Sequence, residues 1–208
     1  MLYLGNHPLN SSSSSVTGDY VVRNGESFYR IANVDGMDDF FISVVSDSNH
    51  WMFISTRGGL SAGRTDCDSA LFPYYTEDKI QDNSGNTGSR TIVIAEQDGK
   101  RKLWEPFSRS HAGIYNITRN LYKNVLGDKL VFEELNHDLG LQFTYSWSTS
   151  DRFGFVKQAS IAALGEVTSR VEMLDGIENL LPYGVLAGTQ NELSCLVDAY
   201  KKNELVPN

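Results

Sequence analysis

The stretch Leu139-Gly-Leu-Gln-Phe-Thr-Tyr-Ser-Trp147 decides the fold class of this 208-residue chain. Every second residue in it is apolar: Leu139, Leu141, Phe143, Tyr145 and Trp147. A period of two places all five side chains on one face of a strand, so the strand should have one buried and one solvent-facing side. This alternation is typical of antiparallel sheets, because the strands of parallel sheets are buried on both faces.

Turn signals separate further β-rich stretches on either side of this strand. Asp98-Gly99 lies between Thr91–Ala95 and Lys102–Trp104 and predicts a hairpin. Earlier in the chain, four short stretches are expected to form a meander of antiparallel strands: Tyr20–Val22, Ser27–Ile31, Phe40–Val45 and Trp51–Ser55. The expected fold class is therefore all-β, an antiparallel β-sandwich.

The two ends of the chain differ from this pattern. Residues 1–18 contain the run Ser11–Ser15 and are expected to be a flexible leader, followed by a sandwich domain over residues 19–186. Residues 187–208 are expected to form an amphipathic helix and linker. Thr189 and Glu192 have the spacing of a capping box, and a helical stripe follows at Leu193, Leu196, Val197 and Tyr200.

Composition argues against several classes of partner. The formal net charge of −8 is unfavourable for a protein that binds phosphate backbones, so no nucleic acid is expected. The sequence has no apolar run of about 18 residues, so no membrane span is expected. The start of the chain lacks a signal-peptide pattern, which slightly favours a cytoplasmic location. Cys67 and Cys195 are far apart and are interpreted as free thiols.

The segment Arg64–Lys79 has neither a strand period nor a helical one and is expected to be a long ordered loop. Its charged and aromatic residues make it a candidate for carbohydrate binding or domain docking, through Arg64, Asp66, Asp68, Tyr74 and Tyr75. The alternative, which we weigh above function, is a loop held to its own domain by Arg64 salt bridges and by packing of Phe72 and Tyr74. No metal is expected, because Asp66 and Asp68 are not followed by further oxygen ligands at calcium-loop spacing.

Two other groups of residues bear on chemistry. Trp104, beside Glu105-Pro106, is the favoured surface platform for a sugar. Glu133 and Glu134 are adjacent on an expected strand, so they should point to opposite faces and cannot act together as general acid and base. Both are expected to be solvated. The four histidines are scattered, and no catalytic residue or cofactor is predicted.

Four segments carry a resemblance to a known group of proteins. They are Leu60-Ser-Ala-Gly-Arg64, Asp68-Ser-Ala-Leu-Phe-Pro-Tyr-Tyr-Thr-Glu-Asp-Lys79, Trp104-Glu-Pro-Phe107 and Leu174-Asp-Gly-Ile-Glu-Asn-Leu-Leu-Pro-Tyr-Gly184. In this order they resemble the N-terminal domain of large bacterial proteins related to cellobiose phosphorylase. The resemblance implies a supersandwich of the galactose mutarotase-like type that precedes a helical-toroid catalytic domain, where the catalytic residues of those relatives lie.

Three functions follow as hypotheses. The first is a non-catalytic domain of a glycoside phosphorylase- or hydrolase-like protein, which supports carbohydrate binding, packs on a downstream helical domain and could contribute to a homodimer. It predicts an exposed apolar patch. The second is a stand-alone sugar-binding or aldose mutarotase-like enzyme, which needs a histidine and an opposed carboxylate in one pocket. The third is a purely structural spacer.

Overall fold

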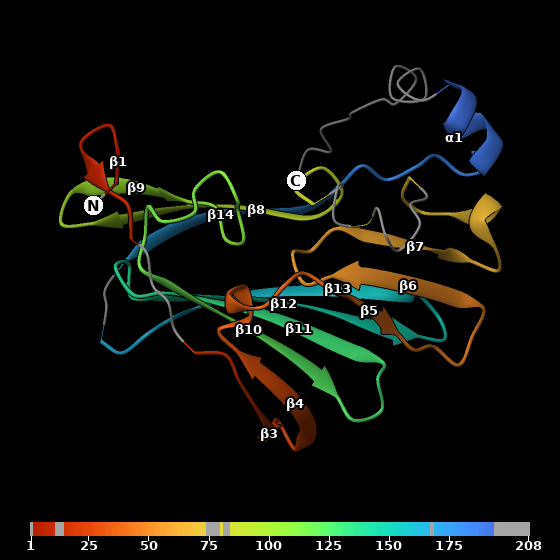
Figure 1. The fold of residues 1–208 in the computed structure, drawn as a ribbon, viewed down its shortest axis with the longest axis horizontal. Helices are drawn as coiled ribbons and strands as arrows, with labels where there is room; N and C mark the ends of the chain where they lie inside the picture. Colours follow the sequence, from red (N-terminus) through yellow and green to blue (C-terminus); the bar gives the residue numbers. More distant parts are fainter. Residues whose placement is uncertain (1, 11–14, 74–79, 81–83, 167–168, 194–208) are drawn as a thin grey trace.

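The computed structural model describes residues 2–10, 15–73, 80, 84–166 and 169–193. Within them, antiparallel strands form two layers around one hydrophobic core, and a single short helix follows near the C-terminal end (Figure 1). The fold is thus all-β and sandwich-like, as the alternating stretch predicts. No helix in these residues is long and apolar enough to cross a bilayer.

The lower layer in Figure 1 is a six-stranded sheet in the order β13-β12-β11-β10-β4-β3. Its strands are β3 (Thr17–Arg23), β4 (Glu26–Ala32), β10 (Ile117–Asn124), β11 (Lys129–Asn136), β12 (Leu141–Ser150) and β13 (Gly154–Ala163). All neighbours in this sheet pair antiparallel. The strand that decides the fold class, β12, is therefore an inner strand between β11 and β13.

Two three-stranded sheets form the other layer (Figure 1). One has the order β14-β8-β9 and consists of β8 (Gly88–Gln97), β9 (Lys100–Trp104) and β14 (Arg170–Glu178). The other has the order β5-β6-β7 and consists of β5 (Phe41–Val44), β6 (His50–Ser55) and β7 (Leu60–Arg64). A small hairpin of β1 (Tyr3–Leu4) and β2 (His7–Pro8) precedes them.

The apolar face of β12 forms the centre of the core. Leu141, Phe143, Tyr145 and Trp147 are all buried, and they pack against residues of both smaller sheets. Leu139 is buried as well but precedes the strand, because Gly140 turns the backbone with a φ of 62°. The other face of β12 carries Gln142, Thr144 and Ser146 and faces away from this core.

The predicted hairpin at Asp98-Gly99 is confirmed, but the predicted meander of the first four strands is wrong. Asn24-Gly25 and Asp98-Gly99 adopt positive φ and join β3 to β4 and β8 to β9. After β4, however, the chain crosses to the other layer through the 3-10 turn η1 (Val34–Gly36), so β5 pairs with β6 and not with β4. Buried Val34 holds this crossing to the core.

The ends of the described chain show further differences. Helix α1 (Ala187–Leu193) begins before Thr189, so the proposed capping box does not cap it. The N–H of Ala187 donates instead to Asp68 Oδ1 at 2.8 Å, from a distant part of the sequence. Residues 194–208, which hold most of the predicted apolar stripe, lie outside the described residues. Thr17 and Gly18, placed in the leader by the sequence, already pair with β4.

Candidate functional site

A groove of about 570 Å³ lies on the outer face of the six-stranded sheet, away from the main core. The β3–β4 hairpin forms one wall and strands β11, β12 and β13 form the floor. Its lining is mostly polar: Arg23, Asn24, Glu26, Phe28, Lys129, Val131, Gln142, Thr144, Ser146, Gln158, Ala159 and Ser160. The volume falls within the usual range for small-molecule sites.

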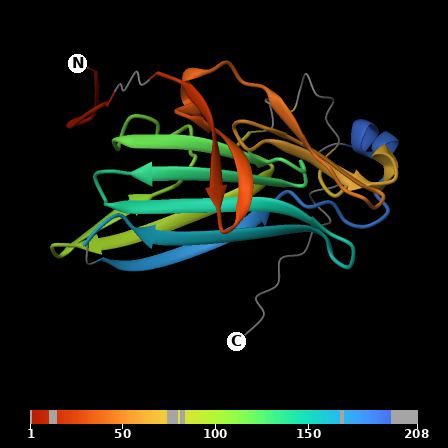
Figure 2. The same cartoon turned by 90° about the horizontal axis from the view of Figure 1, so that it is seen from below.

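The groove exists because the β3–β4 hairpin curls over the sheet to which it is paired. In a flat sheet, β3 and β11 would lie about 14 Å apart, since β4 and β10 separate them and neighbouring strands are about 4.8 Å apart. Yet Arg23 Nη2 of β3 lies 3.3 Å from Glu133 Oε1 of β11. Figure 2 shows β3 and β4 running across the strands of the larger sheet from this side.

Glu133 lies buried beneath the groove, where it contacts Arg23 and Gln142 of the lining. Its Oε2 accepts hydrogen bonds from the Tyr122 hydroxyl at 2.6 Å and from Asn120 Nδ2 at 2.8 Å. Its Oε1 accepts one from Gln142 Nε2 at 2.9 Å and faces Arg23. A buried carboxylate must be paired or hydrogen-bonded, and these four partners meet that requirement.

The aromatic ring of Tyr122 holds the arginine over this carboxylate. The Arg23 guanidinium carbon lies 4.2 Å from the ring centroid, in a cation–π arrangement. Burial, and then the hydrogen bond to Glu133, raise the pKa of Tyr122 to about 12, so the phenol stays protonated and continues to donate. Arg23 Nη1 is buried without a hydrogen-bond partner among the described residues. It is therefore a donor that a ligand in the groove could use.

A second charged pair closes the end of the groove near the hairpin turn. Lys129 Nζ lies 2.6 Å from Glu26 Oε2, and Asn124 Nδ2 donates to Glu26 Oε1 at 2.6 Å. The hydrogen bond from Lys129, followed by that from Asn124, lowers the pKa of Glu26. Each cation of the lining is thus paired with a carboxylate: Lys129 with Glu26 in the groove, and Arg23 with Glu133 beneath it. The groove is therefore close to neutral overall.

Uncharged hydrogen-bonding side chains cover the rest of the floor. On the outer faces of β12 and β13, Thr144 is opposite Ser160 and Ser146 is opposite Gln158. Gln142 precedes them on β12 and is fixed by Glu133 and Thr144. These hydroxyl and amide groups are both donors and acceptors, so they can bind a ligand that carries many hydroxyl groups and no net charge.

Trp104, the predicted sugar platform, is not on the surface. It is 1% exposed and donates its indole N–H to Glu134 Oε1 at 2.7 Å in the core. The prediction failed because β9 pairs with β8, which turns Trp104 inward next to Phe143. A proline two residues later suggested a surface position, but the direction of the side chain depends on strand pairing.

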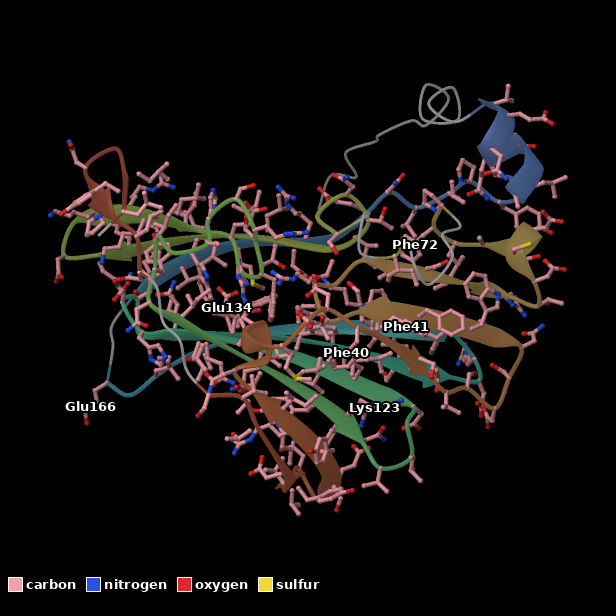
Figure 3. The ribbon with its side chains drawn as sticks, in the orientation of Figure 1. Phe40, Phe41, Phe72, Lys123, Glu134 and Glu166 are labelled. Carbon is pink, nitrogen blue, oxygen red and sulfur yellow. The ribbon has the colours of Figure 1, made fainter. Side chains whose placement is uncertain are left out.

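The loop after β7 is held to its own domain in the part that the structure describes. Arg64 is exposed, and its Nη2 donates to Asn49 Oδ1 rather than to a carboxylate. Asp66 caps the 3-10 turn η2 (Cys67–Ser69) by accepting from the N–H of Asp68, while Asp68 itself caps α1. Phe72 is buried in the core (Figure 3). Tyr74 and Tyr75 lie outside the described residues.

The expectation that Glu133 and Glu134 are solvated is wrong, although they do point to opposite faces. Glu133 lies beneath the groove, whereas Glu134 lies between the layers and binds Trp104 and Arg119 (Figure 3). Sequence reasoning therefore missed the groove. The one local signal was the pair of polar neighbours on β10, Asn120 and Tyr122, at a two-residue spacing that matches the face of Glu133.

Within the described ranges, no three His, Cys, Asp or Glu residues lie together in a way that could hold a metal ion. The sequence matches no family model, and no curated protein is significantly similar to it. The assignment of a function therefore depends on the geometry of the site.

Proposed function

We propose that this chain is a non-catalytic carbohydrate-binding β-sandwich that works beside a catalytic domain, as in the cellobiose phosphorylase-related proteins that its sequence resembles. The observation that carries the proposal is the chemical composition of the groove lining. Its charged residues neutralise one another, and the remaining floor consists of uncharged amides and hydroxyls. An uncharged polyhydroxylated chain is the ligand class that matches such a surface.

The groove favours an oligosaccharide over a single sugar. Thr144 and Ser146 lie two residues apart on one strand, which separates their side chains by about 7 Å along the floor. Arg23 then lies at one end of this row, fixed by Glu133 and Tyr122 before any ligand arrives. Groups that are held in position beforehand lose little entropy on binding, which strengthens recognition of an extended chain.

Titration calorimetry with neutral cello-, xylo- and malto-oligosaccharides tests this proposal. Arg23→Met keeps the apolar stem and removes the guanidinium, and we expect it to weaken binding by about tenfold, the effect of losing charge-assisted hydrogen bonds. Gln158→Ala, at an exposed position on the floor, should weaken binding about threefold without a change in stability.

Arg101→Met is the matched control, because Arg101 forms an exposed ion pair with Glu172 on the other layer. It should bind like the unaltered protein. If no oligosaccharide binds at millimolar concentration, or if Arg23→Met and Arg101→Met bind equally well, the groove is not a carbohydrate site. A chain that binds no sugar in any assay would favour the structural spacer.

Support for a partner domain comes from the segment that follows β14. Its large apolar side chains point to solvent: Leu180, Tyr183, Leu186 and Leu193 are all exposed, Tyr183 completely. Contiguous exposed apolar residues are typical of protein–protein contact surfaces. We expect Tyr183→Ser combined with Leu186→Ser to reduce binding of a hydrophobic dye and any self-association in sedimentation. Unchanged dye binding would contradict a docking role for this segment.

A stand-alone aldose mutarotase-like enzyme is the second candidate, and a single contact favours it. His111 Nδ1 lies 3.6 Å from Glu105 Oε2, so the domain does hold a histidine next to a carboxylate. Mutarotation needs one group that takes the proton of the anomeric hydroxyl and another that protonates the ring oxygen. Polarimetry of fresh α-glucose and α-galactose solutions distinguishes the two functions. The binding function predicts the uncatalysed rate, and rapid exchange that His111→Ala abolishes would favour the enzyme.

A further inference from the structure

A second cavity, of about 200 Å³, lies on the opposite side of β12 from the groove. Phe143 and Tyr145 of β12 form its floor, and Gly58, Thr91 and Phe107 come from three other parts of the chain. A cavity of about 150 Å³ accommodates benzene. The space between the layers is therefore large enough for one six-membered ring with substituents.

Uncharged polar groups dominate the walls of this cavity. They comprise one amide and six hydroxyls: Asn86, Ser84, Thr87, Ser89, Thr91, Ser108 and Ser110. The lining also holds four charged residues. Arg90 Nε lies 2.6 Å from Glu105 Oε1, Arg57 pairs with Asp39, and the fourth, Arg109, is exposed to solvent. Like the groove, the cavity thus offers many uncharged donors and acceptors.

The loop that forms one wall has a strained backbone that the core holds in place. Phe107 has a φ of 62°, in the left-handed region that is unfavourable for a non-glycine residue. Its N–H donates to the buried Glu134 Oε2 at 2.7 Å, and Arg119 Nη2 donates to the carbonyl of Ser108. Strained residues that persist in this way cluster at ligand sites.

The Tyr145 hydroxyl is the polar group of β12 at this cavity. It points toward Gly58, where a Cβ atom would lie 3.0 Å from it, and both residues line the cavity. Because Tyr145 is only 3% exposed, its side chain is held in position before a ligand arrives. A hydroxyl both donates and accepts hydrogen bonds, so this position is suited to a hydroxyl group of a ligand.

We propose that this cavity is a second, independent binding site, which takes one uncharged pyranose ring: a free aldose or the terminal unit of a glycan. Its lining and that of the groove are on opposite faces of β12, so one sugar ring cannot occupy both. The domain would then hold two sugars at once, and a branched or neighbouring glycan bound at both sites would gain avidity.

Backbone amide NMR of the whole chain, titrated with glucose, galactose, mannose and xylose, tests the proposal. We expect shifts of residues 84–91 and 105–110 with at least one aldose. Shifts confined to the groove would overturn this site and leave the proposed function intact. The absence of shifts with every aldose up to about 100 mM, well above the Kd of a millimolar site, would also overturn it.

Tyr145→Phe removes only the hydroxyl, and we expect it to weaken aldose binding by about two- to tenfold. The free variant should be as stable as the unaltered protein, because no hydrogen bond between the described residues is lost. Tyr115→Phe is the control, since the Tyr115 hydroxyl donates to the carbonyl of Leu103 at 2.7 Å and does not line the cavity. Asn86→Ala, at an exposed position on the rim, gives the same test if Tyr145→Phe does not fold. Unaltered aldose binding by both cavity variants would overturn the proposal.

Discussion

Replacing Glu134 by Gln should destabilise the domain more than any change at a surface ion pair. Glu134 is 1% exposed and accepts three hydrogen bonds of 2.7 Å, from Trp104 Nε1, the N–H of Phe107 and Arg119 Nε. An amide has one oxygen to accept with, and its NH₂ group would face one of these donors. Arg119 would keep only the half-exposed Asp35 as its charged partner.

The expected loss follows from these contacts. Removing one partner of a buried ion pair costs about 3–5 kcal/mol, because it leaves an uncompensated buried charge. At about 2–4 °C per kcal/mol for a chain of this size, the melting temperature should fall by roughly 6–20 °C. Urea denaturation followed by tryptophan fluorescence measures the change directly, since Trp104 is one of the three bonded donors.

The control is Glu172→Gln, at the exposed pair with Arg101, which should cost less than about 1 kcal/mol. A loss in Glu134→Gln no larger than in this control would refute the reasoning that the buried carboxylate organises the layer contact. A double-mutant cycle with Arg119→Met isolates the interaction energy between Glu134 and Arg119 from the other effects of each substitution. We expect this coupling energy to be at least about 1 kcal/mol.

Two further predictions concern pH and packing. The pKa of Tyr122 is about 12 in the folded protein and 10.0 ordinarily, so the stability from its protonated phenol is fully present below pH 10 and is lost as pH rises through 12. Urea denaturation between pH 9 and 12 should therefore show a shallower decline of the free energy of unfolding in Tyr122→Phe than in the unaltered protein. An identical decline in both proteins would contradict this role of Tyr122. Gly63→Ala should cost about 1–3 kcal/mol, since a Cβ atom would lie 2.7 Å from Trp51 Cζ2 and 2.8 Å from the carbonyl of Ser69. Gly176→Ala, where no atom lies within 4 Å, should change stability by less than about 0.5 kcal/mol, and equal losses at both positions would count against the steric explanation.

The sequence predicted the features of this fold that depend on near neighbours. The hairpin at Asp98-Gly99 was predicted because both residues tolerate positive φ, a property of the dipeptide itself. The strand β7 was not among the stretches expected from the sequence, although its Leu60 and Ala62 are fully buried. Close packing of Trp51 and Ala70 against Gly63 leaves no room for a side chain there, so that glycine is a packing requirement and not a turn.

The candidate site was much less accessible to sequence reasoning. The groove depends on Arg23 and Glu133, which are distant in sequence and meet because the β3–β4 hairpin bends over the sheet. No local pattern encodes that bend. The same holds for Trp104. The sequence predicted a surface position, but the pairing of β9 with β8 places its side chain in the core.

The alternation along β12 by itself determined an antiparallel, one-sided strand, because the direction of each side chain follows from the backbone of its own strand. Only the tertiary structure decided what each face would contact: a core with a cavity on one side and a polar groove on the other. The reason is physical, since burial and pairing of a charge such as that of Glu133 depend on groups brought by other strands.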